Sequence, residues 1–258
     1  MKAERVVAIV TLGTLLMAAG CKKSQAPSPG APLHYASIDY RDGGSVEGTI
    51  HFVGKAPKPR KIDMSKYPAC AGGPPSYTQG YVVSHGGLAN VFVYVSRGLE
   101  NRVYKAPSKP VIIDERDCRF VPHVAGVMTG QPVEWVNDDA VVHDVHVAPS
   151  VAGNQPVDFS LLPGSGAMQH TFAKPELMMS MRSGDQPWMH GFINVVSNPF
   201  YAISGDSGQY IIHGLPPGAY TLVAYQEHLG MKTADITIGP DHTVTQDFTF
   251  TPGSGSAQ

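Results

Sequence analysis

The stretch DSGQYIIHGLPPGAYTL, residues 206–222, decides the fold. Its Asp206-Ser207-Gly208 and Pro216-Pro217-Gly218 segments are typical of tight turns, because Gly tolerates positive φ and Pro presets the turn backbone. After the second turn, large apolar residues alternate with other residues, and successive side chains of a strand point to opposite faces. Tyr220 and Leu222 therefore share one face, which the pattern predicts to fill the interior of a β-sandwich.

The composition of the whole chain extends this prediction to an all-β protein. Its 28 Gly and 22 Pro fall between short runs rich in Val, Ile, Tyr and Phe, which is typical of many short strands joined by turns. Residues 175–181 form the one candidate for a short helix. Only 16% of the residues are charged, the net charge is −2, and no basic run follows Lys23, which argues against nucleic-acid binding.

The first 21 residues have the pattern of a bacterial export signal. Lys2 and Arg5 provide positive charge, residues 6–17 are apolar, and small residues lead into Cys21. The apolar run is shorter than the ~20 residues that a membrane-spanning helix needs. The approach to Cys21 resembles the lipobox of bacterial lipoproteins, which implies a signal peptide at 1–21 and lipidation of Cys21. An ordinary cleaved signal stays open as the alternative.

Lipidation would place the chain in the cell envelope. Residues 22–42 and 251–258 are rich in small residues and Pro, which predicts a flexible tether and a flexible tail. Lys22, rather than an acidic residue, follows the cysteine, and by resemblance to Gram-negative lipoproteins this indicates the periplasmic side of the outer membrane. In an oxidising compartment Cys70 and Cys118 are predicted to form a disulfide, with free thiols or metal ligands as the alternative.

A second set of motifs lies upstream of the opening stretch. Phe120-x-Pro122 is followed by GQPVEWVNDD (130–139), then by HDV (143–145), and later by PWM (187–189) before a predicted strand. This order resembles that of cupredoxins. More narrowly, it resembles bacterial lipoproteins that join a cupredoxin-like domain to a carboxypeptidase-regulatory-like domain, whose signature residues 206–222 match closely.

The resemblance covers about residues 44–250 and implies the domain organisation. A cupredoxin-like Greek-key β-sandwich at 43–197 would pack against a smaller immunoglobulin- or transthyretin-like β-sandwich at 198–250. The linker around Pro199 is short, so we expect the two sandwiches to form one unit. Residues 46–53 resemble the first strand of a regulatory-like domain, so their pairing with the C-terminal half stays open.

The resemblance also locates a copper site. Members that bind copper use a His after the Asn-x-Asp strand, then Cys, His and Met from the last loop. The matching positions in this chain are His143, Ser183, Gln186 and Met189. Because a blue-copper centre needs a thiolate and two imidazoles, Ser183 and Gln186 imply that the site is degenerate.

A different metal site is the alternative. His146 and His190 could add nitrogen ligands near His143, and Met178, Met179 and Met181 lie just upstream of the last loop. Against this, His143 and His146 are an odd number of residues apart and fall on opposite faces of a regular strand. Methionines are also common as adaptable core residues. The expectation is therefore that no cofactor binds, with copper as the alternative.

The chain lacks the motifs of the common enzyme classes. It contains no Gly-x-Ser-x-Gly elbow, His-Glu-x-x-His pair or glycine-rich phosphate loop. Adjacent acids such as Asp138-Asp139 are typical of turn caps rather than of an acid–base pair. The predicted function is a non-enzymatic binding or scaffold module of the cell envelope.

Two other functions stay open. The C-terminal resemblance to a carbohydrate-binding-like fold favours glycan binding, although a fold alone does not determine function. Sugar rings would then stack on Tyr201, Tyr210, Tyr225 or Trp188. A copper-handling or electron-transfer role would instead use His143 and Met189. The expected partners are the membrane, through the lipid anchor, and a glycan or an envelope protein.

Overall fold

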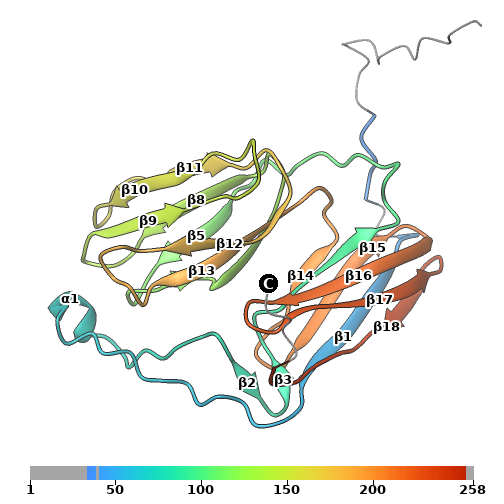
Figure 1. Cartoon of the computed structure of the whole chain (residues 1–258). Coiled ribbons are helices and arrows are strands. Elements are labelled where there is room, and N and C mark those ends of the chain that lie inside the picture. Colours follow the sequence, from blue (N-terminus) through green and yellow to red (C-terminus); the bar gives the residue numbers. More distant parts are fainter. Residues whose placement is uncertain (1–33, 39–40, 254–258) are drawn as a thin grey trace, which may run out of the picture. The chain divides into compact units, whose positions relative to one another are not determined.

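Strands make up almost all of the regular structure (Figure 1). The computed structural model describes residues 34–38 and 41–253, and this part of the chain contains nineteen strands and one helix, α1 (Pro68–Ala71). The prediction of an all-β protein is thus confirmed. The described residues contain no helix long and apolar enough to span a membrane. Cys21, the predicted signal at 1–21 and most of the predicted tether lie outside the described residues.

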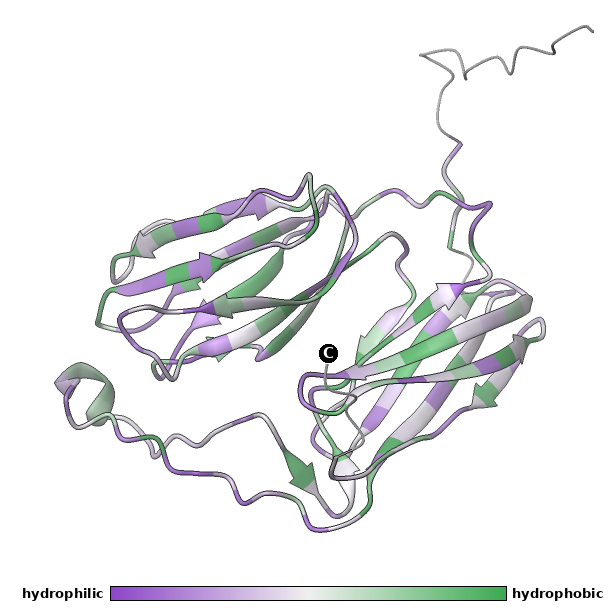
Figure 2. Ribbon diagram, viewed as in Figure 1, coloured by the Kyte–Doolittle hydropathy of each residue, from purple (hydrophilic) through white to green (hydrophobic). Residues whose placement is uncertain are grey.

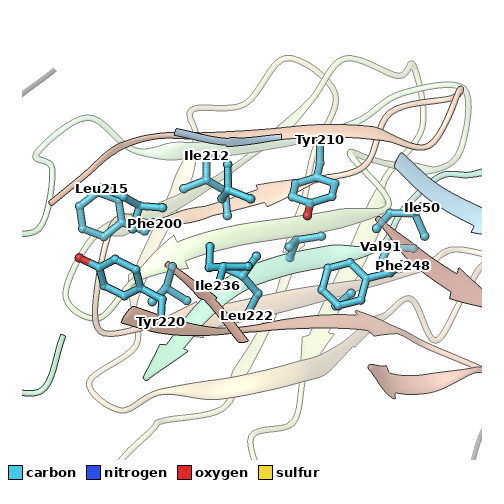
Figure 3. Packing of buried hydrophobic residues seen from close by; sticks show 14 of the residues in the cluster. Ile50, Val91, Phe200, Tyr210, Ile212, Leu215, Tyr220, Leu222, Ile236 and Phe248 are labelled. Atoms are coloured by element: carbon cyan, nitrogen blue, oxygen red, sulfur yellow. The ribbon is translucent and has the colours of Figure 1, made fainter. Parts of the chain in front are cut away.

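Ten strands from the two ends of the described chain form what we call the terminal sandwich. One sheet has the order β15-β1-β3-β2, with β18 and β19 also pairing with β1, and the other has the order β14-β4-β16-β17. Ile50, Tyr210 and Leu222 are among the side chains that fill its core (Figure 3). The strands are β1 (Gly44–Phe52), β2 (Val83–Ser84), β3 (Gly87–Leu88), β4 (Phe92–Arg97), β14 (Tyr201–Ile203), β15 (Gln209–Leu215), β16 (Gly218–Gln226), β17 (Gly230–Ile238), β18 (Thr243–Thr245) and β19 (Phe248–Phe250).

Strand β1 connects the beginning of the described chain to its end. It pairs antiparallel with β15 and parallel with β18 and β19, so that Ile50 lies opposite Phe248. On the other sheet, β4 pairs with β14 and β16. The alternative in which the opening strand pairs with the C-terminal half is therefore confirmed. Strands β1 to β4 fall within the expected domain at 43–197, but they bury their apolar residues against strands of the expected domain at 198–250. The terminal sandwich is therefore built from both expected domains.

The chain between β4 and β14 forms a second sandwich, which we call the inserted sandwich. Its sheets have the orders β10-β9-β12-β13-β7 and β11-β8-β5-β6. Every second residue of β8, including Trp135, is buried in its core, and Figure 2 shows apolar and polar residues mixed along the strands. The strands are β5 (Val111–Glu115), β6 (Phe120–Val121), β7 (Val124–Met128), β8 (Pro132–Asn137), β9 (His143–Val147), β10 (Val157–Leu161), β11 (Met168–Thr171), β12 (Glu176–Arg182) and β13 (His190–Val196).

Strand β12 occupies the segment in which a short helix was the expectation. Met179 and Met181 point into the core of the inserted sandwich. Met178 has a positive φ of 48°, and the pairing with β13 shifts register between Glu176 and Met179. This irregularity interrupts the two-residue alternation of a strand, which explains why the sequence pattern did not indicate one.

A disulfide attaches the segment that carries α1 to the inserted sandwich. Cys70 of α1 is bonded to Cys118, which confirms the prediction. Met64 and Cys70 are buried with the inserted core. The ring of Tyr67 packs edge-on against Trp188, with 4.8 Å between the ring centroids. The segment therefore covers the turn between β12 and β13, where Trp188 lies.

The two sandwiches contact each other, and the described residues from His34 onward belong to one compact unit. Phe92 of β4 forms a buried cluster with Val124 and Val196 of the inserted sandwich. Tyr201 of β14 donates its hydroxyl to the carbonyl of Gly126 at 3.1 Å. A Cβ at Gly126 would lie 2.5 Å from the Tyr201 ring, so this close approach requires glycine.

Candidate functional site

His143 opens β9 and is completely buried, at 0% exposure. Its Nδ1 lies 3.0 Å from Oε1 of Gln186, and its Nε2 lies 2.9 Å from Oδ2 of Asp139. Asp139 also accepts the backbone N–H groups of Asp117 and Cys118, each at 2.8 Å. Both ring nitrogens of His143 are therefore engaged by other residues of the chain.

Ser183 and Gln186 lie in the turn between β12 and β13 and extend this network. Ser183 donates its hydroxyl to Asp144, and the backbone N–H of Gln186 donates to the Ser183 oxygen at 2.9 Å. The N–H groups of Gly184 and Asp185 donate to the same carboxylate at 2.6 and 3.1 Å. Burial alone would raise the pKa of Asp144, but these hydrogen bonds outweigh it and lower the pKa to about 2.

One arrangement of protons satisfies the whole network. A half-turn of the Gln186 carboxamide exchanges its oxygen and nitrogen, which have nearly the same shape. The amide nitrogen then donates to Nδ1 of His143 and to the Ser183 oxygen, which lies 3.1 Å from the same amide atom. His143 donates from Nε2 to Asp139, and the Ser183 proton goes to Asp144. Each hydrogen bond then has one proton and one acceptor.

Met189, the fourth residue that the sequence resemblance indicated, is buried in the same turn. Its backbone N–H donates to the carbonyl of Gln186 at 2.8 Å, and its carbonyl accepts the N–H of Ser183 at 3.1 Å. The indole N–H of Trp188 donates to the carbonyl of Cys118 at 3.0 Å. The structure thus joins His143 to Ser183 and Gln186 through hydrogen bonds, with Met189 in the turn that carries them.

Glu115 is a buried acid that sequence reasoning missed. It ends β5, has 0% exposure, and finds no hydrogen-bond partner for its carboxyl group within the described part of the chain. Burial, reinforced by the charges of Asp139 and Asp144, raises the pKa of Glu115 to about 8. The group is therefore mostly protonated at neutral pH. Alternation along β5 could have found it, because Ile113 and Glu115 fall on one face.

His146 and His190, the two alternative ligands, lie elsewhere. His146 points out of β9 with 46% of its side chain exposed, and its ring nitrogens lie 2.7 Å from Asp144 and 3.1 Å from Asp158. His190 begins β13 and packs edge-on against His123, with 5.2 Å between the ring centroids. No hydrogen bond or ion pair of the described residues joins either side chain directly to His143.

The residues at His143 do not fit a blue-copper centre. Such a centre needs a thiolate, and the two cysteines among the described residues are bonded to each other. The sulfur of Cys118 lies within 4.8 Å of ligand atoms of Asp139 and His143, but a disulfide sulfur is not a thiolate. An ion at His143 would also displace a buried hydrogen bond, and an unpartnered buried polar group costs about 1–3 kcal/mol.

The aromatic residues considered for glycan stacking are mostly engaged in packing. Tyr210 is buried and donates its hydroxyl to the carbonyl of Gln246 at 2.5 Å. Tyr201 packs against Phe92 at the contact between the sandwiches. Trp188 lies against Tyr67. Tyr225 on β16 is only half-buried, so these four residues do not form a flat exposed platform.

A second group of histidines gathers where the two sandwiches meet. His123 approaches Glu227 of the terminal sandwich, with 2.8 Å between Nε2 and Oε1. A ring nitrogen of His123, one of His190 and a carboxylate oxygen of Glu227 all lie within 4.8 Å of one another. Sequence reasoning missed His123 and Glu227, because 104 residues separate them and neither belongs to a motif.

Comparison with known proteins gives partial similarities of fold. No protein-family model and no curated protein matches the chain. Among solved structures, the chain is similar to a copper-containing nitrite reductase from Thermus scotoductus SA-01, with 26% identity over 41% of this chain and a TM-score of 0.32. It spans a quarter of the length of that protein.

The chain is also similar to variants of amicyanin in the Cu(I) state. One has 21% identity over 33% of this chain and 81% of the amicyanin, with a TM-score of 0.30. Another has 18% identity over 40% of this chain and 97% of the amicyanin, with a TM-score of 0.31. At these TM-scores the similarities carry no argument about what this chain binds, so its function has to be argued from its own residues.

Proposed function

We propose that the chain is a non-enzymatic binding or scaffold module of the cell envelope. In this proposal a hydrogen-bonded network stands at the position where related cupredoxins hold copper. The observation that carries it is the double engagement of His143, by Gln186 on one ring nitrogen and by Asp139 on the other. A histidine that ligates a metal needs one nitrogen with a free lone pair.

The network has a structural role that accounts for its buried polar residues. Asp139 holds the turn after β5 through two backbone N–H groups, and His143 links Asp139 to Gln186. Ser183 and Asp144 then fix the turn between β12 and β13. Side chains that bond to backbone groups in this way order loops that lack strand partners. Such loops suit a surface that recognises a partner by its shape.

A copper titration of the purified chain tests the proposal. Wild-type protein should show no intense absorption at about 600 nm with Cu²⁺, because no thiolate is present for charge transfer. Its copper isotherm should match that of His143→Gln, since His143 is not a ligand. Tight copper binding that His143→Gln abolishes would overturn the proposal and favour the copper-handling alternative.

The converse experiment restores the missing ligands. The double substitution Ser183→Cys and Gln186→His supplies the thiolate and the second imidazole of the family's site, and should create an intense band at about 600 nm with Cu²⁺. Ser183→Cys with Gln186→Asn is the matched control, which has the thiol but one imidazole fewer. A colourless double variant that remains folded would show that these positions do not correspond to the family's copper ligands.

The envelope location rests on Cys21, and a cell fractionation experiment tests it. Replacing Cys21 with Ser removes the site of lipidation, and acyl chains contribute about 0.8 kcal/mol per buried CH₂ to membrane binding. The variant should move from the membrane fraction to the soluble fraction. A Cys21→Ser protein that stays with membranes at high salt would show that protein contacts provide the attachment.

A further inference from the structure

Four side chains with metal-ligating groups meet where the inserted and terminal sandwiches touch. His123 lies between β6 and β7, and His190 is the first residue of β13. Glu227 and His228 form the turn between β16 and β17 of the terminal sandwich. The group is separate from His143, and no motif or resemblance in the sequence points to it.

Backbone carbonyls orient the two histidines of the inserted sandwich. Nδ1 of His123 lies 3.1 Å from the carbonyl of His190, and Nδ1 of His190 lies 3.0 Å from the carbonyl of Trp188. A carbonyl only accepts, so each Nδ1 carries a proton, which leaves the lone pair of His190 on Nε2. Metal-ligating histidines almost always have this second hydrogen bond, which fixes the tautomer and the ring. Nε2 of His123 donates to the Glu227 carboxylate at 2.8 Å, so an ion bound there would replace that proton.

Glu227 supplies the carboxylate of the group. Its Oε1 lies 2.8 Å from Nε2 of His123, and the side chains of Glu227 and His123 are 3% and 1% exposed. His228 adds a third imidazole, with Nε2 3.6 Å from the other carboxylate oxygen of Glu227. Its ring stacks on Tyr81 at 5.1 Å and is 49% exposed, so it lies between the buried group and solvent.

A route from solvent reaches the group. A cavity of about 350 Å³ is lined by residues 57–60, by Tyr81 and by His190 and His228. An ion entering there would meet His228 and His190 before the buried pair of His123 and Glu227. An ion pair between the two sandwiches would account for His123 and Glu227 alone. It would not explain why the Trp188 carbonyl orients the ring of His190, or why a further imidazole, that of His228, lines the cavity.

We propose that His123, His190 and Glu227 form a site for a divalent transition-metal ion of the Zn²⁺ type, with His228 as the fourth ligand. Imidazole nitrogens with one carboxylate oxygen are a common ligand set for Zn²⁺. Zinc at about 2.1 Å from each ligand places tetrahedral ligand atoms about 3.4 Å apart. The His123 and Glu227 atoms, now 2.8 Å apart, would separate by about 0.6 Å, and the other pairs, now within 4.8 Å, would close by at most about 1.4 Å.

The site would hold the two sandwiches together, because its ligands come from both. Zinc bound only by the folded chain raises the free energy of unfolding by mass action. Isothermal titration of the full chain with Zn²⁺ should therefore show one ion per chain, and saturating Zn²⁺ should raise the melting temperature. Co²⁺ in place of Zn²⁺ should give the visible absorption of a tetrahedral site.

Substitutions of the outer ligands separate binding from folding. His190→Asn keeps a donor for the Trp188 carbonyl but removes the Nε2 ligand, and it should weaken Zn²⁺ binding by at least about tenfold. His228→Asn should weaken it less, because that ring is the most exposed. His146→Asn is the matched control, since His146 is a half-exposed histidine elsewhere in the inserted sandwich, and it should bind Zn²⁺ like wild type. Glu227→Gln is informative only if circular dichroism shows that it folds.

Three results would overturn the site. These are folded wild-type chain that takes up no stoichiometric Zn²⁺, His190→Asn that binds Zn²⁺ as tightly as wild type, and His146→Asn that loses as much affinity as His190→Asn. The outcome is independent of the proposed function, because His143→Gln should leave the Zn²⁺ isotherm unchanged. A failed copper experiment at Ser183 and Gln186 would likewise leave this site standing.

Discussion

The inserted sandwich contains two buried histidines, His143 and His123, whose surroundings differ in one decisive respect. At His143 the Nε2 and Nδ1 atoms meet an acid and an amide that together satisfy both. At His123 a backbone carbonyl takes Nδ1, and Nε2 faces an acid with a second imidazole nearby. Both rings are thus engaged on both nitrogens, but only the second group has a further imidazole, that of His190, and a cavity through which an ion could reach it.

The comparison shows that the position of a residue in a family's pattern does not by itself determine its chemistry. The sequence resemblance proposes His143 as a ligand, yet in the structure its Nδ1 lies against Gln186, which in turn is bonded to Ser183. His123 belongs to no ligand pattern, yet the ligand atoms of His190 and Glu227 lie within 4.8 Å of its ring nitrogen. The second imidazole and the cavity, rather than the hydrogen bonds of the buried ring itself, separate the two cases.

Removing the disulfide should have the largest effect on the free energy of unfolding. Of the two histidine groups, it should disturb only the one at His143. Cys70→Ala with Cys118→Ala opens a loop of 48 residues, which predicts a loss of about 4 kcal/mol in the free energy of unfolding. Urea denaturation measures it. The backbone N–H of Cys118 donates to Asp139, so the network at His143 should loosen, while Zn²⁺ affinity at His123 stays within twofold. A parallel loss of Zn²⁺ affinity would show that the two groups are coupled.

Glu115 should have the next largest effect on the free energy of unfolding, and this effect should depend on pH. Its folded-state pKa of about 8 lies above the ordinary 4.5, so between these values the folded chain keeps a proton that the unfolded chain has lost. Stability should therefore fall as pH rises, by about 3 kcal/mol between pH 5 and pH 7.5. Glu115→Gln should remove this slope in urea denaturation at the two pH values. The exposed Glu47→Gln is the control, and an unchanged slope in Glu115→Gln would show that Glu115 is solvated or paired.

Asp144 should give the smallest effect, with the opposite pH dependence. Its pKa of about 2 lies below the ordinary 3.8, so its contribution is present above pH 4 and is lost as pH falls towards 2. Asp144→Asn should cost about 2 kcal/mol at pH 7, because the donors from Ser183, Gly184 and Asp185 lose a charged acceptor. The cost should shrink towards pH 2. A constant cost across this range would assign the loss to packing instead.

The sequence predicted the fold class because it rests on local signals, and the disulfide because Cys70 and Cys118 are the two cysteines left once Cys21 is assigned to lipid. Turn residues such as Pro216-Pro217-Gly218 and alternating apolar residues indicated strands, and β15 and β16 lie where the opening stretch placed them. The shared sheets were harder to predict, because nothing local in β1 distinguishes a partner at residue 120 from one at residue 248. Strand β12 was missed because Met178 interrupts its alternation.

The candidate sites likewise include residues that a sequence pattern could locate and residues that only the folded structure brings together. His143, Ser183 and Gln186 could be placed together because a family pattern aligned them, and the structure joins them by hydrogen bonds. Glu115 was readable only from its strand register. His123 and Glu227 meet only after both sandwiches have formed and docked, which no spacing along the chain can indicate.

The pairing of β1 has a consequence for the order in which an exported chain can fold. Export from the N-terminus, as proposed, would deliver β1 first and its parallel partners β18 and β19 last. The inserted sandwich needs no strand beyond Val196 and could form while the remainder is still crossing the membrane. The terminal sandwich must wait for residues 243–250, and pairing over such long separations is slow. A chain that ends before Thr243 would leave an edge of β1 open to other strands, so complete translation is a condition for a soluble product.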